Sequence, residues 1–505
     1  MSSTPCPGTA VDAPRPSLPG LLTAPHLVDV AAPGMEAMAL WLAGAGADVT
    51  GSVPKAHQDS PVVAALKAAG VQVHVGFGPA HVNTDRTAAV WSGAVAGPHP
   101  ELDHAQALRL PILPRPVALR MISAQAYTVA VAGSHSTATA AAALAALLDD
   151  GDTGWILNAP AVGGVAGHAA GRRIVTDFCP DNTTHEAAPT AAWQRRPTPY
   201  FDHRELRLAA ALVMSTSANA PHYEDNLEGL GAAERLARHA DTIVLPMWDN
   251  TLANLHEHLT DRPDPNLNLV TVGFAPDSTV QIASFARVGA AYHAVMRHRQ
   301  TDHPFILPVT GRHHALAVCA AVATALAIGE HPGRIAERAA AFRGVQRSLT
   351  VLGEEADVTV VDSRARHPRE IMLDVQAALA LTEHSVLVVL QPDGLARATM
   401  HAAAIGDAIA DGDLALLLPV STPLSHHTVP DPLDAIEQKA RLLLGDGAVH
   451  RARTGPGEVG PEQQIGAMVT EGDLVLVVGT GPAERLGPRL LSHLASGDMP
   501  TPQLL

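Results

Sequence analysis

Short apolar runs that read as strands alternate with helical stretches along most of this chain, and this alternation restricts the possible folds more than any other feature. One such unit starts at HLVDV (26–30), a second at YTVAVAG (127–133) and a third at DVTVVDS (357–363). Strands that are joined through helices pair in parallel, which predicts a sheet with helices on both faces in each unit. We therefore expect an α/β protein with three consecutive α/β domains.

The length of the chain supports this division, because 505 residues exceed what one hydrophobic core organises. Residues 1–24 are rich in Pro and Ser and lack the apolar segment of a signal peptide, so we expect a disordered tail there. We place the three domains at residues 25–123, 124–346 and 347–505.

Composition argues against several kinds of partner and location. The net charge of −16 disfavours nucleic acid, whose phosphates attract clustered Lys and Arg. No apolar run is long enough to predict a membrane span, and a cytoplasmic protein is the default expectation. The adjacent histidines of GRHH (311–314) and SHHT (425–428) would point to opposite faces of a strand, so we predict no dedicated zinc site.

The second unit opens with a strand, a turn of small residues and an alanine-rich helix, VAVAGSHSTATAAAALAALL (129–148). This arrangement is typical of a phosphate-binding loop, which normally carries a lysine followed by Ser or Thr where the helix starts. Here the helix begins Ser136-Thr137-Ala138, without a lysine. The lysines of the chain are Lys55, Lys67 and Lys439. The stretch is either a phosphate loop that has lost its charge or an ordinary strand–turn–helix junction.

Six segments resemble, in the same order, motifs of the Mur ligases, which are ATP-dependent amide-forming enzymes of peptidoglycan synthesis. The likeness is greatest to the UDP-N-acetylmuramate–L-alanine ligases within that family. It implies a Rossmann-like N-terminal domain for the UDP-sugar, a central P-loop-type ATPase-like domain and a Rossmann-like C-terminal domain. The segments are VDVAAPGM (28–35), VAGSHSTATA (131–140), TGRHHALAVCAA (310–321), FRGVQRSL (342–349), VDSRARHPREI (361–371) and VVLQPDGLARA (388–398).

The resemblance also implies binding residues. It places Gly34 and Met35 in the loop that cradles the UDP-sugar, and Arg397 at an arginine that faces the amino-acid substrate. Arg347 matches another arginine of the family, and each arginine fits a carboxylate receptor or a structural ion pair equally well. The ATP phosphate loop corresponds to Gly133, Ser134, His135, Ser136, Thr137, Ala138 and Thr139.

Three further positions match family residues only in part. Asp177 lies where the family has a magnesium-binding glutamate, and His222 is the best match to a histidine of a neighbouring motif. His367 is the second histidine of the third-domain motif, whose first histidine is replaced by Arg366. We interpret Asp177, His222 and His367 as vestigial catalytic candidates and predict no metal ligand.

The departures from the family fall where its chemistry takes place. Thr137 replaces the phosphate lysine, Ala138 the magnesium hydroxyl and Ala317 the asparagine that contacts adenine. Asp29 replaces the first glycine of the UDP loop, where a carboxylate repels a diphosphate. Loss of the lysine alone removes a charge-assisted contact of about 1.5–3 kcal/mol.

We therefore expect a pseudoenzyme that keeps the fold, needs neither ATP nor Mg²⁺, and acts as a binding or regulatory partner of a genuine Mur ligase or another peptidoglycan enzyme. One alternative is an active ATP- and magnesium-dependent ligase with an altered phosphate site, in which Arg172 or Arg173 supplies the missing charge. Another is a protein that binds a UDP-sugar or an amino acid in the cleft between its domains.

Overall fold

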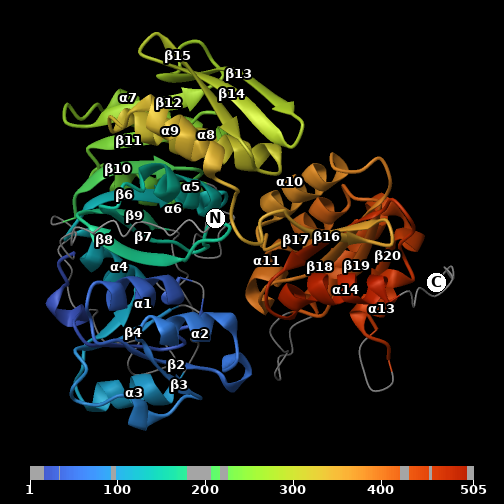
Figure 1. Cartoon of the computed structure of the whole chain (residues 1–505), viewed down its shortest axis with the longest axis horizontal. Helices are drawn as coiled ribbons and strands as arrows, with labels where there is room; N and C mark the ends of the chain where they lie inside the picture. The colour runs from blue at the N-terminus through green and yellow to red at the C-terminus, as the bar shows by residue number, and fades with distance from the viewer. Residues whose placement is uncertain are drawn as a thin grey trace, which may run out of the picture.

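The structure, a computed structural model, describes residues 16–32, 34–92, 98–178, 206–216, 226–420, 431–453 and 458–496. In these residues the strands form three separate sheets, and apolar clusters pack against the faces of each. The sheets use residues 25–114, 127–307 and 350–479 in turn, so the prediction of three consecutive α/β domains is confirmed (Figure 1).

The first domain has a five-stranded parallel sheet in the order β3-β2-β1-β4-β5, a Rossmann-like arrangement. Leu22, in the 3-10 turn Gly20–Leu22, is fully buried, so ordered structure begins before residue 25. The elements are β1 (Pro25–Leu27), α1 (Met35–Gly44), β2 (Thr50–Val53), α2 (Pro61–Ala68), β3 (Gln72–Val75), β4 (Ala88–Trp91), α3 (Pro100–Ala107), β5 (Ile112–Pro114) and α4 (Arg115–Ser123).

The central domain is built on a ten-stranded sheet in the order β15-β14-β13-β12-β11-β10-β6-β9-β7-β8. Its middle strands are parallel, and β13–β15 add an antiparallel meander at one edge. The strands are β6 (Tyr127–Ala132), β7 (Thr153–Ile156), β8 (Gly167–Gly171), β9 (Arg173–Asp177), β10 (Leu208–Val213), β11 (Thr242–Pro246), β12 (Asn268–Gly273), β13 (Val280–Val288), β14 (Ala291–His298) and β15 (Thr301–Leu307). The helices are α5 (Thr137–Leu148), α6 (Asn226–Ala237), α7 (Ala253–Asp261), α8 (Arg312–Ala327) and α9 (Pro332–Ala341).

Helices α5 and α8 lie side by side in the centre of this domain and are buried almost all round. A helix that is apolar on every face belongs in a core rather than on a surface. The many alanines of TATAAAALAALL and ALAVCAAVATALA allow the two helices to pack closely against each other and against the sheet. The alanine-rich helix of the sequence is therefore a core helix, and its N-terminus carries the loop 133–136.

The third domain has a six-stranded sheet in the order β16-β17-β21-β18-β19-β20, parallel except for β16. Its strands are β16 (Thr350–Glu355), β17 (Val358–Ser363), β18 (Val386–Gln391), β19 (Leu414–Leu417), β20 (Val449–Arg451) and β21 (Leu474–Gly479). Its helices are α10 (Pro368–Leu379), α11 (Leu395–Ile409), α12 (Pro432–Leu444), α13 (Pro461–Gly466) and α14 (Leu486–Ala495).

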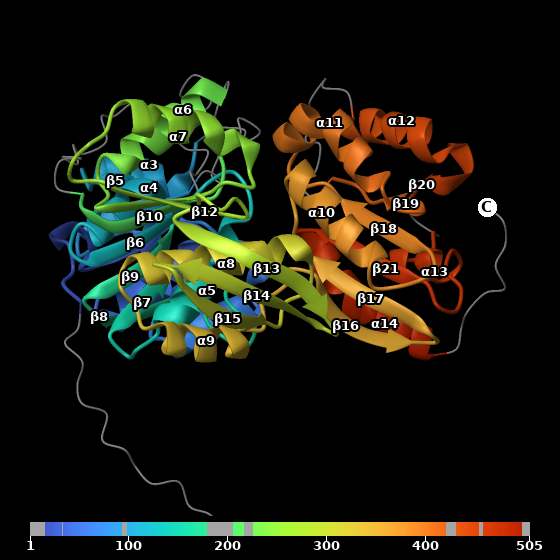
Figure 2. The ribbon, with the colours of Figure 1, turned by 90° about the horizontal axis from the view of Figure 1, so that it is seen from above.

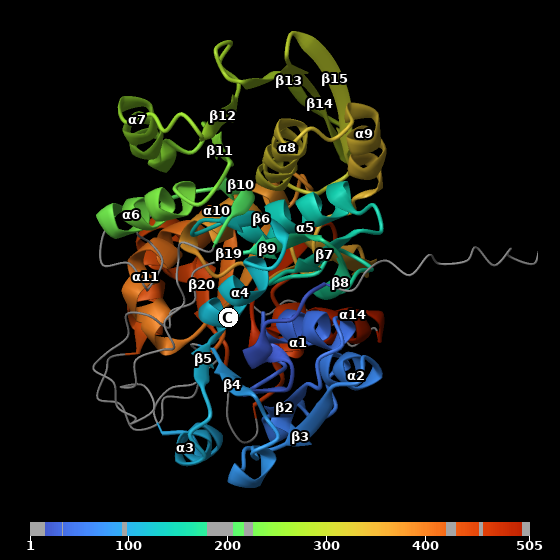
Figure 3. The same ribbon diagram turned by 90° about the vertical axis from the view of Figure 1, so that its left-hand side faces the viewer.

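The first and central domains are stacked, and the third domain lies beside them (Figures 1 and 3). The β13–β14 hairpin reaches across toward the third domain (Figure 2), and Arg287 of β13 donates a hydrogen bond of 3.0 Å to the carbonyl of Ala380 after α10. In the segment that connects α9 to β16, Gln346 N–H donates to the carbonyl of Pro160. Helix α10 faces the N-terminal ends of α5 and α8, since Glu370 contacts Ser136 and Asp374 contacts His313.

Candidate functional site

The loop between β6 and α5 keeps the shape of a phosphate loop. Gly133 has φ of 145°, and an added Cβ there would lie 2.9 Å from the backbone nitrogen of Ser215. The backbone N–H of Ser134 donates to the Ser215 hydroxyl at 2.9 Å, which fixes the turn against the end of β10. Ser136 adopts a left-handed conformation with φ of 61° just before the helix. This turn leaves the N–H groups of the first helical turn directed out of α5.

A carboxylate of the third domain lies at this helix N-terminus. Glu370, in the first turn of α10, accepts a hydrogen bond of 2.9 Å from the backbone N–H of Ser136. Burial favours the neutral form, but the Ser136 N–H and the nearby His367 and His135 together hold the pKa of Glu370 below its usual range. Helix N-termini bind anions, and here the anion is a side chain of the protein itself.

His135 of the loop is held by an ion pair within the central domain. Its Nε2 lies 3.2 Å from Oδ2 of Asp249, and Thr251 donates to the same carboxylate from both its N–H and its hydroxyl. Although burial opposes it, these hydrogen bonds lower the pKa of Asp249 to about 2. The His135 ring is 5.6 Å from the ring of His367. His135 thus joins the loop to the segment that follows β11 and approaches the third domain.

At the loop positions where the family has its lysine and its metal-binding hydroxyl, residues 137 and 138, this chain has neither a charged group nor an exposed oxygen. The side chains of Thr137 and Thr139 are buried, and Ala138 is partly buried against the core. Arg172 and Arg173, which the active-ligase alternative would use for the missing charge, both lie at the start of β6 and not at this loop. Arg173 lies opposite Tyr127 at the start of β6 and pairs with Glu330 at 2.7 Å. The loop follows the other end of β6, about 17 Å away at roughly 3.3 Å per residue.

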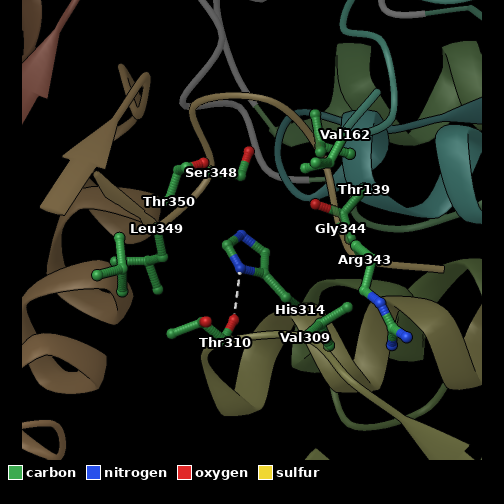
Figure 4. Close-up of a pocket in the computed structure, with 12 residues that line it drawn as sticks. Thr139, Val162, Val309, Thr310, His314, Arg343, Gly344, Ser348, Leu349 and Thr350 are labelled. Atoms are coloured by element: carbon green, nitrogen blue, oxygen red, sulfur yellow. Dashed lines mark hydrogen bonds between the residues drawn. The ribbon is translucent and has the colours of Figure 1, made fainter. Parts of the chain in front are cut away.

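A cavity of about 200 Å³ lies behind the loop, between the central and third domains. The His314 imidazole points into it, and its Nδ1 donates a hydrogen bond to the Thr310 carbonyl at 2.9 Å (Figure 4). Burial lowers the pKa of His314 to about 4, and the adjacent His313 adds to the effect. The cavity is smaller than the 300–1,000 Å³ usual for small-molecule sites. Ala317, expected to replace an adenine contact, is buried in the core and does not line the cavity.

The UDP-loop positions of the first domain are filled by the protein's own side chains. Gly34 has φ of 79°, and an added Cβ there would overlap the guanidinium of the buried Arg115. Met35 is fully buried in the core of the domain. Asp29 has φ of 54°, and burial raises the pKa of its carboxyl, an effect that His57 partly offsets. Both predicted residues, Gly34 and Met35, are therefore buried.

The predicted arginines of the third domain make ion pairs. Arg347 forms a bidentate pair with Asp362, at 2.7 and 3.1 Å, and also donates to the Gly479 carbonyl at 2.8 Å. Arg397 lies 3.9 Å from Asp393, one turn earlier in the chain. The contacts of Arg347 therefore fit a structural ion pair better than a carboxylate receptor for a substrate.

Two of the three vestigial candidates lie near the phosphate loop. Asp177 ends β9 opposite Val131, at the same edge of the sheet as the phosphate loop, and is buried. His367 begins α10, where its Nδ1 accepts from the N–H of Arg369, and burial is the main cause that lowers its pKa to about 4. His222 lies outside the described residues. The structure thus places Asp177 of the central domain and His367 of the third domain near the loop.

Two arginines meet at Asn158 and join the three domains, a contact that sequence reasoning missed. Arg115 of the first domain donates to Asn158 Oδ1 at 2.6 Å, and Arg364 of the third domain contacts the Asn158 carbonyl at 3.4 Å. Burial, reinforced by Arg366 and Arg347, lowers the pKa of Arg364 to about 10, so it stays charged at neutral pH. The available signal was that Arg364 lies within VDSRARHPREI (361–371), a segment that resembles a family motif.

No helix in the described ranges combines the length and apolar character needed to cross a bilayer. The chain is similar to known proteins over nearly its whole length. Residues 25–127 match the profile described as "Mur ligase family, catalytic domain".

Curated relatives and solved structures agree with this match. The UDP-N-acetylmuramate–L-alanine ligase of Streptomyces coelicolor is 30% identical over 493 residues, covering 95% of this chain and 99% of that protein. The protein of the same name from Thermobifida fusca is 27% identical, covering 93% and 96%. The crystal structure of MurC from Thermotoga maritima aligns with a TM-score of 0.71 at 19% identity, covering 94% and 100%. A murein peptide ligase from Psychrobacter arcticus aligns with a TM-score of 0.67 at 17% identity, covering 94% and 99%. The chain belongs to the Mur ligase family.

Proposed function

We propose that this chain is a MurC-like member of peptidoglycan precursor synthesis that does not catalyse ATP-dependent ligation, and that it acts in the cytoplasm as a binding or regulatory partner. Its relatives are named for joining L-alanine to UDP-N-acetylmuramate. The observation that carries the proposal is the N-terminus of α5, where Ser136, Thr137 and Ala138 provide no positive charge and Glu370 provides a negative one.

Glu370 belongs to the segment that resembles the family motif, so the glutamate alone does not distinguish this chain. The difference lies in what surrounds it. Phosphoryl transfer depends on electrostatic clamping of the γ-phosphoryl by a loop lysine and by a metal that a loop hydroxyl holds. The central domain contains no lysine at all, and the hydroxyl position is Ala138. A triphosphate at this loop would meet the Glu370 carboxylate without a cation between them.

ATP and Mg²⁺ therefore do not fit the residues present. Ser136 adds a Cβ in a left-handed backbone position where the family has glycine. The cavity behind the loop is small, and the adenine-contact position is buried in the core. The substitutions at residues 136, 137, 138 and 317 affect the phosphates, the metal and the base together, so a single compensating contact does not restore the site.

A restored-loop variant tests the proposal. We expect no rise in the melting temperature of the wild-type chain with ATP·Mg²⁺. The variant Ser136→Gly/Thr137→Lys/Ala138→Thr should be stabilised by about 2.7 kcal/mol when ATP·Mg²⁺ is at a hundred times its dissociation constant. AMP, which lacks the β- and γ-phosphates, is the control and should stabilise neither chain. A wild-type shift with ATP·Mg²⁺ equal to that of the restored variant would refute the proposal.

A further inference from the structure

A group of three potential metal ligands bridges the central and third domains. His313 and His314 belong to the first turn of α8, and Asp374 lies in the middle of α10. One ligand atom from each residue lies within 4.8 Å of the other two. None of the three was predicted as a site residue, because adjacent histidines were assigned to opposite faces of a strand. Residues 313 and 314 instead begin a helix, where that alternation does not apply.

Two of the ligand atoms face each other without forming a hydrogen bond. Nε2 of His313 lies 3.0 Å from Oδ1 of Asp374. Both atoms are buried, and neither has a hydrogen-bond partner in the described part of the chain. The two groups make an ion-pair contact whose geometry satisfies no hydrogen bond. Buried polar atoms without a hydrogen bond cost about 1–3 kcal/mol each, so native structures seldom retain them without a reason. In a tetrahedral zinc site with bonds of 2.0–2.1 Å, neighbouring ligand atoms are about 3.3 Å apart, close to the separation here.

The remaining polar atoms of two of these side chains orient them as second-shell contacts orient metal ligands. His314 Nδ1 donates to the Thr310 carbonyl, and because a carbonyl only accepts, Nε2 of His314 keeps its lone pair. Oδ2 of Asp374 accepts a hydrogen bond of 2.5 Å from the Ser363 hydroxyl, which leaves Oδ1 toward His313. Protein metal sites commonly fix the tautomer of a histidine and the orientation of a carboxylate in this way.

We propose that His313, His314 and Asp374 form a site for one divalent transition-metal ion, Zn²⁺ in the first instance, that joins the central and third domains. Two imidazole nitrogens and one carboxylate oxygen are a usual zinc ligand set, whereas Mg²⁺ prefers oxygen ligands alone. The three atoms need to approach by at most about 1.5 Å to reach the 3.3 Å spacing of a tetrahedral ion. Of the three ligands, His314 lines the cavity behind the phosphate loop (Figure 4), so the site borders this cavity.

The site does not depend on the proposed function. Its ligands lie on α8 and α10 and use none of residues 133–139 of the phosphate loop. Bound metal would hold α10 against α8 and so favour the arrangement of domains seen here, with or without nucleotide. The site is structural in this respect, although the adjoining cavity leaves room for a small ligand such as water.

The test uses the full-length chain after dialysis against EDTA, with Co²⁺ and Zn²⁺ as the probes. We expect one equivalent of Co²⁺ to bind and to give the intense visible absorption of a four-coordinate ion, and Zn²⁺ to displace it. His313→Ala and Asp374→Ala should each weaken Co²⁺ binding at least tenfold and remove the visible bands. His258→Ala, which breaks a histidine–carboxylate pair with Glu234 on the surface, is the matched control and should bind as the wild type does.

Circular dichroism and urea unfolding in EDTA show whether each variant is folded, so loss of binding is not confused with loss of structure. If His313→Ala does not fold, His314→Gln provides a second probe of the same site. Binding of Co²⁺ that is unchanged in both Asp374→Ala and a folded histidine variant overturns the proposal. So does a wild-type chain that takes up less than one equivalent at micromolar Co²⁺.

Discussion

Substitution of Glu370 by glutamine removes the negative charge at the N-terminus of α5 and nearly preserves the shape of the side chain. The carboxylate accepts the Ser136 N–H at 2.9 Å across the boundary between the central and third domains. A hydrogen bond to a charged group contributes about 1.5–3 kcal/mol and a neutral one about 0.5–1.5 kcal/mol. The helix dipole adds about 0.3–1 kcal/mol for an anion at this position.

The substitution should therefore cost about 1.5–2.5 kcal/mol of interdomain free energy. We call the arrangement of domains seen here closed, and an arrangement in which the third domain has separated from the central domain open. Since each 1.4 kcal/mol is a factor of ten, the ratio of open to closed molecules should rise about 10–60-fold. Single-molecule energy transfer between dyes on the central and third domains measures this ratio. Glu437→Gln, which removes a carboxylate paired with Arg451 and Arg441 inside the third domain, is the matched control.

Acidification gives an independent check on the same contact. The pKa of Glu370 is lowered in the closed form, so its contribution is complete above the ordinary glutamate value and is lost as pH falls through the lowered pKa. The open fraction of the wild-type chain should rise at acidic pH by this mechanism, and Glu370→Gln should have a larger open fraction at neutral pH and respond less. An energy-transfer distribution of Glu370→Gln that matches both the wild type and Glu437→Gln would refute the reasoning.

Three further predictions concern stability, each measured by urea unfolding. Glu101 is fully buried; hydrogen bonds from Ser52 and His81 and an ion-pair contact with His26 at 3.4 Å outweigh burial and lower its pKa to about 2. Glu101→Gln should therefore cost the first domain about 3 kcal/mol of unfolding free energy at pH 7. The stability advantage of the wild type should be complete above pH 4.5 and be lost as pH falls toward 2. Equal stability of the two chains at pH 7 would refute this prediction. Gly34→Ala should cost about 1–3 kcal/mol through its positive φ and the overlap with Arg115, and an unchanged midpoint would contradict this. Arg347→Met should cost the third domain about 2 kcal/mol by breaking its bidentate ion pair, which a neutral result would exclude.

The sequence was sufficient for the three-domain α/β architecture because alternating strand and helix patterns are local. The meander β13–β15 was not predicted, although it forms one edge of the central sheet. Its strands mix exposed polar and apolar residues and contain Pro304, so their pattern is weak, and an edge position tolerates a proline. The short β1 also differs from the expected strand 26–30, because the left-handed Asp29 ends the extended backbone.

The phosphate loop was predictable in shape because strand, turn and helix follow one another in the sequence. Its partner was not, since Glu370 lies 234 residues away and approaches only through the packing of two domains. The same holds for Arg115 and Arg364, which meet at Asn158. The motif comparison indicated which positions differ from the family, and only the three-dimensional structure showed which residues contact those positions.

Release of phosphate measures the central claim most directly. Purified wild-type chain is incubated with ATP·Mg²⁺, UDP-N-acetylmuramate and L-alanine, and the Streptomyces coelicolor relative serves as the positive control. We predict no phosphate release above the background of the reaction without L-alanine, while the relative turns over. Phosphate release by this chain that depends on both UDP-N-acetylmuramate and L-alanine would contradict the account and establish an active ligase.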